Sequence, residues 1–449
     1  MSVKLNEKLL ESLQVAIQQQ NNRFIQETLK DKHAADISVL LDQMDALESK
    51  YILRLLNPEM SADIVADLEE DTRKGFLKNF SSEELAGLMD YTDSDDAADI
   101  LNDQPVKVRE EVIALMQNSE KAEYIIDLLH YEEDCAGGLM AKELIKANIN
   151  WNIKQCIEEI RRQTKNVEKV YTVYVVNDKD TLLGRVSLKK IVLSTDDTKI
   201  KDIYVSNIQT VQTYYSEEEV AEIMRKYDLE VVPVVNVQGK LLGRITIDDV
   251  VDVITEQAEL ERQIMSGLSE TAEVDDSIWT LSRARLPWLI IGMMGGLLGA
   301  QYMGFFENEL KIVPAIAFFV PLIQATGGNV GIQSSTIVVQ TLVGNPFDGK
   351  SLGSRLFKVL LVAIFNGIVI SSLVFGFVMI FNEMNMAFVV AVALFNVVLI
   401  ASLTGTITPL ILDRLGVNPA LASGPFITTA NDLIGLAVYF TVAKLLFSI

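Results

Sequence analysis

The amino-acid sequence predicts a multidomain chain with an all-α, superhelical N-terminal domain, two α/β domains in tandem and a membrane domain of five α-helices. Three observations carry this prediction: apolar residues at helical spacing, a strand-rich segment repeated at an offset of 59 residues, and five long uncharged runs. The expected boundaries are 1–136 for the helical domain, 137–196 and 197–256 for the α/β domains, 257–280 for a connecting helix and 281–449 for the membrane domain.

The helical domain carries a short repeated element. Ala-Asp-Ile recurs within residues 34–37, 61–64 and 97–100, and Gly and Pro are rare in the apolar runs around it. Such degenerate repeats are typical of helical pairs that stack into a small superhelix. An Asp in such an element caps a helix or lies on a solvated face, and only as part of a larger group would it bind a ligand.

The two α/β domains share a pattern of strand, turn, second strand and helix. Residues 175–185 match residues 234–244, each running from Val-Val-Asn to Leu-Leu-Gly-Arg. The pattern over residues 138–256 resembles a tandem pair of CBS domains. This resemblance implies a disc that often dimerises, and it leaves ATP as a possible ligand.

Some CBS pairs bind adenine nucleotides through a Ser or Thr followed by Asp three residues later. Thr246 and Asp249 fit this signature in the second domain, whereas Ser187 is followed by Lys190 in the first. We prefer a helix N-cap as the interpretation of Thr246 and Asp249, because Thr at the cap and Asp in the first turn both stabilise a helix start.

Acidic charge is concentrated in the first part of the chain. Residues 1–276 hold 31 basic and 55 acidic side chains, a net charge of −24, whereas residues 277–449 hold eight basic and six acidic ones. An acidic surface repels nucleic acid and attracts cations, so we expect no nucleic-acid partner. The polar segment 1–30 is unlike a signal peptide, and two cysteines are too few for a disulfide framework. Both observations favour a cytosolic location for the first part of the chain.

Each of the five uncharged runs can supply the ~20 apolar residues that a spanning helix needs. The second is too long for one simple span and contains Pro314 and Pro321, so we expect it to be broken. Basic residues precede the first run and separate the second from the third and the fourth from the fifth. The positive-inside rule therefore places the N-terminus in the cytoplasm and the C-terminus outside, in the cell inner membrane. The runs are 286–306, 312–347, 359–382, 384–412 and 415–443.

Asp432 is the one charged side chain between Leu415 and Ala443. A charge at the bilayer centre costs at least ~2.5–3.5 kcal/mol, so such a residue is usually retained for a task. A carboxylate there attracts a cation or relays a proton. Two segments rich in small and polar residues, 327–336 and 418–432, indicate backbone exposed to a water-filled path or close helix packing.

These segments resemble the MgtE family of magnesium channels. Gly-Gly-Asn-x-Gly-x-Gln-Ser begins at Gly327, and Pro-Ala-x-x-x-Gly-Pro-Phe-x-Thr-Thr-x-x-Asp ends at Asp432. The order of domains matches as well. The resemblance implies a homodimer in the lipid bilayer, with a pore on the twofold axis and a hydrated Mg²⁺ at Asp432. It implies a polar lining from Asn329, Gly328, Thr428 and Asn431.

The resemblance also implies gating by cytosolic Mg²⁺, which would bridge acidic faces and close the pore. The candidate carboxylates lie on the helical domain, the second CBS domain and the connecting helix. They are Asp95, Asp96, Asp99, Asp228, Asp248, Asp249, Asp252, Glu256, Glu259 and Glu261. A solvated helix face is the alternative for any one of them.

The chain departs from the family pattern at three places. Ile332 stands where many members have Asn, and Asn418 stands where an acidic residue is common before Pro419. The connecting helix is less acidic at its start than in many members. These differences put one inner-mouth ion site and the strength of regulation in question.

Other functions remain open on the sequence alone. A channel for Co²⁺ or Mn²⁺, or a CBS-regulated membrane protein that responds to an adenine nucleotide, would carry similar features. An anion transporter is disfavoured because no basic residue accompanies Asp432 at midspan. An intramembrane aspartyl protease needs two carboxylates that share a proton, and the chain has no Gly-x-Gly-Asp arrangement, so we expect no enzyme activity.

Overall fold

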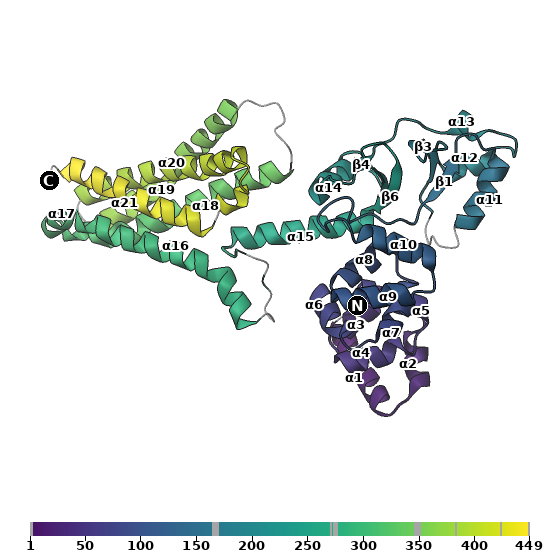
Figure 1. The fold of residues 1–449 in the computed structure, drawn as a ribbon. Helices are drawn as coiled ribbons and strands as arrows, with labels where there is room; N and C mark the ends of the chain where they lie inside the picture. Colours follow the sequence, from purple (N-terminus) through teal and green to yellow (C-terminus); the bar gives the residue numbers. More distant parts are fainter. Residues whose placement is uncertain are drawn as a thin grey trace. The chain divides into compact units, whose positions relative to one another are not determined.

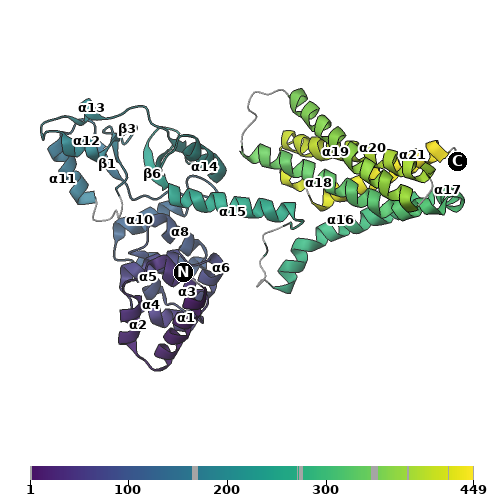
Figure 2. The same ribbon diagram turned by 180° about the vertical axis from the view of Figure 1, so that it is seen from behind.

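The structure is a computed structural model that describes residues 3–163, 170–269, 272, 277–344, 352–381, 384–422 and 424–447. It divides into two compact units, Met1–Ile254 and Thr255–Ile449. The first unit holds the helices α1 to α10 and two small sheets, and the second holds the long apolar helices (Figures 1 and 2). The predicted fold class is confirmed in all three parts.

The N-terminal domain consists of short helices. Their ranges are α1 (Val3–Gln18), α2 (Asn22–Leu29), α3 (Ala34–Leu41), α4 (Ala46–Leu53), α5 (Pro58–Ala66), α6 (Glu70–Leu77), α7 (Ser82–Met89), α8 (Ser94–Asn102), α9 (Val106–Leu115) and α10 (Ser119–Leu128). Helices α3, α5, α7 and α9 contact one another in succession.

The repeated Ala-Asp-Ile element explains how such short helices persist. Ile37, Ile64 and Ile100 are fully buried, on α3, α5 and α8 respectively, while the preceding Asp is exposed in each case. Isolated helices of this length are marginal in water, so burial of the apolar face stabilises them. Local caps add to this, as Ser81 and Glu84 form a capping box at the start of α7.

The CBS pair contains two three-stranded sheets of the same topology. In each, the first two strands are parallel and the last two antiparallel. The strands are β1 (Ile145–Asn148), β2 (Val173–Val176), β3 (Leu182–Val186), β4 (Val211–Gln212), β5 (Val231–Val235) and β6 (Leu241–Thr246). The associated helices are α11 (Ile153–Gln163), α12 (Leu188–Leu193), α13 (Ile200–Ile203) and α14 (Glu217–Lys226).

The helical domain and the second CBS domain share one hydrophobic core, which runs from Leu13 to Val250. A buried polar contact joins them as well. Ser94, at the start of α8, donates from Oγ to Oε2 of Glu143 at 2.6 Å and accepts from the Lys142 backbone N–H at 2.9 Å. The start of α8 is therefore held against the CBS pair.

The last CBS helix continues into the segment expected to connect the domains. Helix α15 runs from Ile247 to Met265, so it belongs to the first unit up to Ile254 and to the second from Thr255. The first long apolar helix, α16 (Ile278–Gly304), begins eight residues before the uncharged run at Leu286. Part of the expected connecting helix, residues 270–271 and 273–276, lies outside the described residues.

Among the described residues, five helical segments are long and apolar enough to cross a membrane. Besides α16, they are built on α18 (Val320–Gly344), α19 (Leu352–Phe381), α20 (Met384–Arg414) and α21 (Pro425–Phe447). The second and fifth segments begin with a short 3₁₀ turn at a proline, Pro314–Phe319 and Pro419–Ala422 respectively. The short helix α17 (Glu307–Ile312) precedes the second segment.

Helix α20 is the most enclosed helix of the second unit. It contacts α18, α19 and α21, and these four helices run side by side in both views (Figures 1 and 2). By contrast, α16 and α19 expose large apolar side chains such as Leu289, Phe365 and Phe377. Apolar surface of this extent suits lipid or a second copy of the chain better than water.

Candidate functional sites

Asp432 lies two turns into α21, which starts only after the break between the turn at Pro419 and Pro425. Its carboxylate is half-buried and faces α18 where that helix carries Gly328. A Cβ at position 328 would lie 3.6 Å from Asp432 Oδ1. The absence of a side chain on Gly328 thus leaves the carboxylate beside bare backbone.

Thr428 lies one turn before Asp432, and its Oγ1 donates to the Gly424 carbonyl at 3.0 Å. The methyl group of Thr428 therefore faces Gly328, at 3.1 Å from the position of a Cβ there. Asn329 is the next residue on α18 and is exposed. The structure thus brings together Asp432, Gly328 and Thr428, with Asn329 next to Gly328 along the chain.

No basic side chain neutralises Asp432 within the described residues of the second unit. The ion pairs there join Arg262 to Glu259, Lys311 to Glu307 and Lys444 to Glu309, and none of them involves Asp432. A half-buried carboxylate without a protein counter-charge is suited to attract a cation.

Asn431 occupies a different environment from its neighbour. Its side chain is 1% exposed, and its Oδ1 accepts a hydrogen bond from Thr404 Oγ1 of α20 at 2.7 Å. The sequence predicts Asn431 as a pore-lining residue, but here its amide lies in the contact between α18, α20 and α21.

In the first unit, an acidic cluster forms between α8 and the start of α15. It comprises Asp95, Asp96, Asp99 and Asp249. Surrounding protein removes water from these carboxylates and raises the pKa of Asp96 and of Asp99 to about 7, although both side chains remain exposed at the surface. Repulsion from Asp249 adds to the effect on both. Desolvation also raises the pKa values of Asp95 and Asp249.

A second acidic contact joins the same two parts of the first unit. Burial raises the pKa of Asp67, at the end of α5, and repulsion from Asp252 on α15 contributes. Burial likewise raises the pKa of Asp252, and repulsion from Asp248 raises it further. Sequence patterns predicted Asp248 and Asp252 but missed Asp67, because nothing in the sequence marks a residue that only the tertiary fold brings to α15.

The remaining predicted carboxylates are more scattered. Asp228 lies in the turn after α14, with a backbone φ of 50°. Glu256 and Glu259 are exposed on the later part of α15, where Glu259 lies 3.8 Å from Arg262. Glu261, on the same helix, has a pKa raised by burial.

The acidic cluster lacks the geometry of a dehydrated metal site. No group of three or more His, Cys, Asp or Glu side chains among the described residues is arranged to hold a metal ion directly. Mg²⁺ gives up its waters reluctantly, and a hydrated ion can be held through its waters by carboxylates that stand further apart. The arrangement therefore suits a hydrated ion better than a bare one.

Within the described residues, the CBS pair has two clefts in equivalent positions of the repeat, of which one is open and the other filled. The open cleft has a volume of about 200 Å³. Polar, basic and aromatic side chains from both CBS domains line it: Thr172, Tyr174, Arg185, Asn207, Gln209 and Tyr227, with Val205, Ile208, Leu229, Val231 and Pro233.

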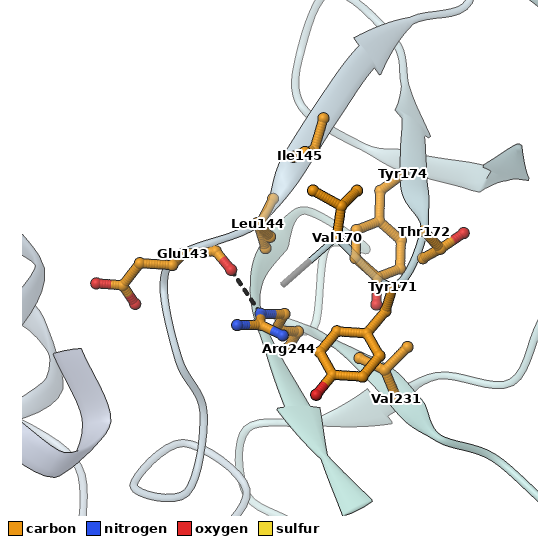
Figure 3. Close-up of a pocket in the computed structure, with 9 residues that line it drawn as sticks. All are labelled: Glu143, Leu144, Ile145, Val170, Tyr171, Thr172, Tyr174, Val231 and Arg244. Atoms are coloured by element: carbon orange, nitrogen blue, oxygen red, sulfur yellow. Dashed lines mark hydrogen bonds between the residues drawn. The ribbon is translucent and has the colours of Figure 1, made fainter. Parts of the chain in front are cut away.

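The equivalent cleft is filled by Arg244, the repeat partner of Arg185 (Figure 3). Arg244 Nε donates to the Glu143 carbonyl at 2.5 Å, and its guanidinium lies 5.2 Å from the centre of the Tyr171 ring. The cleft that remains has about 10 Å³, room for no more than a water molecule.

Thr246 and Asp249, predicted as a weak nucleotide signature, bond to each other. Asp249 Oδ2 accepts from Thr246 N–H at 3.0 Å and from Thr246 Oγ1 at 2.7 Å, at the start of α15. This is the arrangement of a capped helix start. Neither residue is among those that line the open cleft.

Comparison with known families gives three matches along the chain. Residues 320–442 match the family model described as MgtE, a divalent cation transporter. Residues 32–134 match the MgtE intracellular N domain, and residues 136–194 and 200–256 match CBS domains.

Two curated relatives are similar over most of their length. The magnesium transporter MgtE of Thermus thermophilus is 32% identical over 455 residues, covering 98% of this chain and 99% of the relative. The magnesium transporter MgtE of Bacillus subtilis is 29% identical, covering 91% and 90%.

Two solved structures resemble the first part of the chain. One is the soluble part of a magnesium transporter, with a TM-score of 0.51 and 29% identity over 56% of this chain and 99% of that one. The other is the cytosolic domain of the Mg²⁺ channel MgtE in complex with ATP, with a TM-score of 0.51 and 30% identity over 54% of this chain and 99% of that one.

Proposed function

Because this chain belongs to the MgtE family of magnesium transporters, we propose that it conducts Mg²⁺ into the cell past Asp432 and closes when cytosolic Mg²⁺ is high. It is a multi-pass membrane protein with a cytosolic N-terminal domain, and it is not an enzyme. We place it in the cell inner membrane with the C-terminus outside. The observation that carries the proposal is the half-buried Asp432 carboxylate, which has no ion-pair partner among the described residues.

A homodimer would bring two copies of Asp432 to one axis. Two carboxylates balance the charge of one divalent cation but over-compensate a monovalent one. Mg²⁺ keeps most of its octahedral waters, so the site would hold the ion through charge and through oxygen atoms that accept from those waters. Gly328, Thr428 and Asn329 would line the path, and Asn431 would hold the helices that form it together.

The acidic cluster and the Asp67–Asp252 contact would form the sensor. Without metal, like charges at these contacts repel each other, and this repulsion adds to the desolvation that raises the pKa values of Asp67, Asp96 and Asp99. Bound Mg²⁺ would replace repulsion by attraction and hold the helical domain against the CBS pair. Glu256, Glu259 and Glu261 on α15, and Asp228 and Asp248, would contribute further sites. Each site would be weak, and the sum would give a graded response.

The open cleft of the CBS pair would bind ATP. The cytosolic domain of a relative has been crystallised with ATP, and the cleft here offers two tyrosines and Arg185 for a base and a phosphate chain. The capped pair Thr246 and Asp249 remains the weaker candidate for nucleotide contacts. The ATP site would adjust the sensor, since both lie in the first unit.

Ion flux into liposomes that contain the purified chain tests the proposed function. Mg²⁺ uptake should exceed that of protein-free liposomes, and Mg²⁺ on the cytosolic side should inhibit it. Parallel uptake of Co²⁺ and Mn²⁺ decides between a magnesium channel and the broader divalent cation transporter that the family model describes. No uptake of any divalent cation would refute the proposal.

A further inference from the structure

Three spanning helices meet at the contact around Asn431. Thr404 Oγ1 on α20 lies 2.7 Å from Asn431 Oδ1 on α21, against 3.0 and 3.1 Å from the Ile400 and Ala401 carbonyls of its own helix. We assign the one hydroxyl proton to Asn431 Oδ1, the nearest acceptor. The other end of the amide lies against Gly331 on α18, where an added Cβ would stand 1.9 Å from Asn431 Nδ2. Only a residue without a side chain leaves room for the amide at that point.

The backbones of α18 and α20 also touch at the same level. A Cβ at Gly405, the residue after Thr404, would lie 2.4 Å from the Gly331 carbonyl oxygen. Two glycines thus let α18 and α20 approach closely, and Asn431 fills the angle between them. Nδ2 of Asn431 is buried and has no hydrogen-bond partner among the described residues, so the Thr404 hydroxyl is the one polar group that holds this amide.

The position of Asn431 determines where the next side chain points. Successive residues of an α-helix are 100° apart around the axis, so fixing Asn431 between α18 and α20 fixes the direction of Asp432. That direction leads to Gly328, one turn of α18 before Gly331. A small rotation of α21 would move the carboxylate away from the bare backbone.

We propose that Thr404 is a positioning residue, which acts through Asn431 to set the rotation of α21 that presents Asp432 beside Gly328. The inference rests on the proposed function, since it assigns Asp432 to the ion path. A hydroxyl on α20 thereby determines ion affinity without lining the path. Buried hydrogen bonds between membrane helices are modest in strength, so the effect of losing this one should be measurable but limited.

Three variants of α20 isolate the hydroxyl. Thr404→Val removes it at nearly constant volume, Thr404→Ser keeps it, and Thr404→Ala removes it with less bulk. Thr408→Val is the matched control, because Thr408 lies one turn further along α20 and its Oγ1 donates to the Thr404 carbonyl of the same helix at 2.8 Å, its one side-chain hydrogen bond among the described residues.

The measurement is the initial rate of Mg²⁺ uptake into liposomes containing the full chain, as a function of external Mg²⁺ and per amount of folded protein. Thr404→Val and Thr404→Ala should raise the half-saturating Mg²⁺ concentration about 3- to 10-fold, the effect of one lost hydrogen bond. Thr404→Ser and Thr408→Val should match the unaltered chain. A purely structural role would lower the amount of folded protein and leave the half-saturating concentration unchanged, and this result would overturn the proposal.

Asp432→Asn separates this inference from the proposed function. If Asp432→Asn transports Mg²⁺ normally, the ion path itself is wrong, whatever Thr404 does. If Asp432→Asn is inactive and Thr404→Val has the half-saturating concentration of Thr408→Val, the positioning role alone is wrong.

Discussion

Oδ1 of Asp432 faces Gly328, and a methyl group on Gly328 would stand 3.6 Å from this oxygen, the distance of an ordinary contact. The same methyl group would lie 3.1 Å from Thr428 Cγ2, closer than side chains normally approach. The space next to the carboxylate is therefore defined by two helices, α18 and α21. Water around a hydrated ion would occupy that space.

Gly328→Ala should narrow this space and lower the maximal rate of Mg²⁺ uptake about tenfold, as expected for overpacking of ~1.4 kcal/mol. Gly296→Ala is the control, because a Cβ at Gly296 on α16 meets nothing within 4 Å. Uptake into liposomes measures both. Equal rates for the two variants would show that Gly328 does not border the ion path.

Neutralising the acidic cluster should have two opposite effects on the first unit. Asp95→Asn with Asp249→Asn removes repulsion, so the metal-free chain should unfold at a higher temperature than the unaltered chain. The same change removes charge that would hold Mg²⁺, so the rise in unfolding temperature on adding Mg²⁺ should shrink. Thermal unfolding of the full chain in EDTA and in Mg²⁺ measures both effects.

Asp197→Asn serves as the control for the cluster, since Asp197 is an exposed carboxylate in the segment between the two stretches that match CBS domains. It should leave the Mg²⁺-dependent rise unchanged. If the double variant keeps the full Mg²⁺-dependent rise, the cluster is not part of the sensor.

Protons should compete with Mg²⁺ at the cluster. The pKa values of Asp96 and Asp99 are about 7 in the metal-free fold, against an ordinary value of 3.8. The raised pKa values mean that the folded state binds more protons than the unfolded state between about pH 4 and pH 7. The contribution of these two carboxyl groups to folding stability is therefore fully present below about pH 4 and is lost as pH rises through 7. Mg²⁺ needs the charged carboxylates, so its binding should strengthen over the same range.

The Mg²⁺ concentration that gives half of the thermal stabilisation should therefore be lower at pH 8 than at pH 6. Unfolding curves at fixed pH, with Mg²⁺ varied, measure this concentration. A value independent of pH would mean that Asp96 and Asp99 do not bind the ion.

The open cleft should lose nucleotide affinity when its basic and aromatic groups are removed. Arg185→Ala and Tyr227→Ala should each weaken ATP binding about 5- to 30-fold, in line with the loss of a charge-assisted hydrogen bond or a ring contact worth ~1–2 kcal/mol. Titration calorimetry on the full chain measures the affinity. Arg161→Ala on the exposed face of α11 is the control. If it weakens ATP binding as much as Arg185→Ala does, the loss comes from removing a positive charge anywhere on the domain and not from the open cleft.

The sequence predicts the fold well because most of its signals are local. Prolines mark the breaks before α18 and α21, and the buried Ile residues of the Ala-Asp-Ile element mark the helices of the N-terminal domain. The lone charge at Asp432 stands out against an apolar run without any knowledge of the fold.

The contacts that surround these signals are not local, and the sequence could not reveal them. Thr404 and Asn431 are 27 residues apart, and Ser94 and Glu143 are 49 apart. A polar residue in an apolar helix looks the same in sequence whether it lines a path, as predicted for Asn431, or is buried between helices. Helix packing decides which, and single-sequence patterns do not encode packing partners.

The most direct test of the central claim is Mg²⁺ uptake into liposomes by the Asp432→Asn variant, beside the unaltered chain at equal amounts of folded protein. The substitution keeps the size of the side chain and removes its charge. We predict uptake at the level of protein-free liposomes. Uptake at the unaltered rate would contradict the assignment of Asp432 to the ion path.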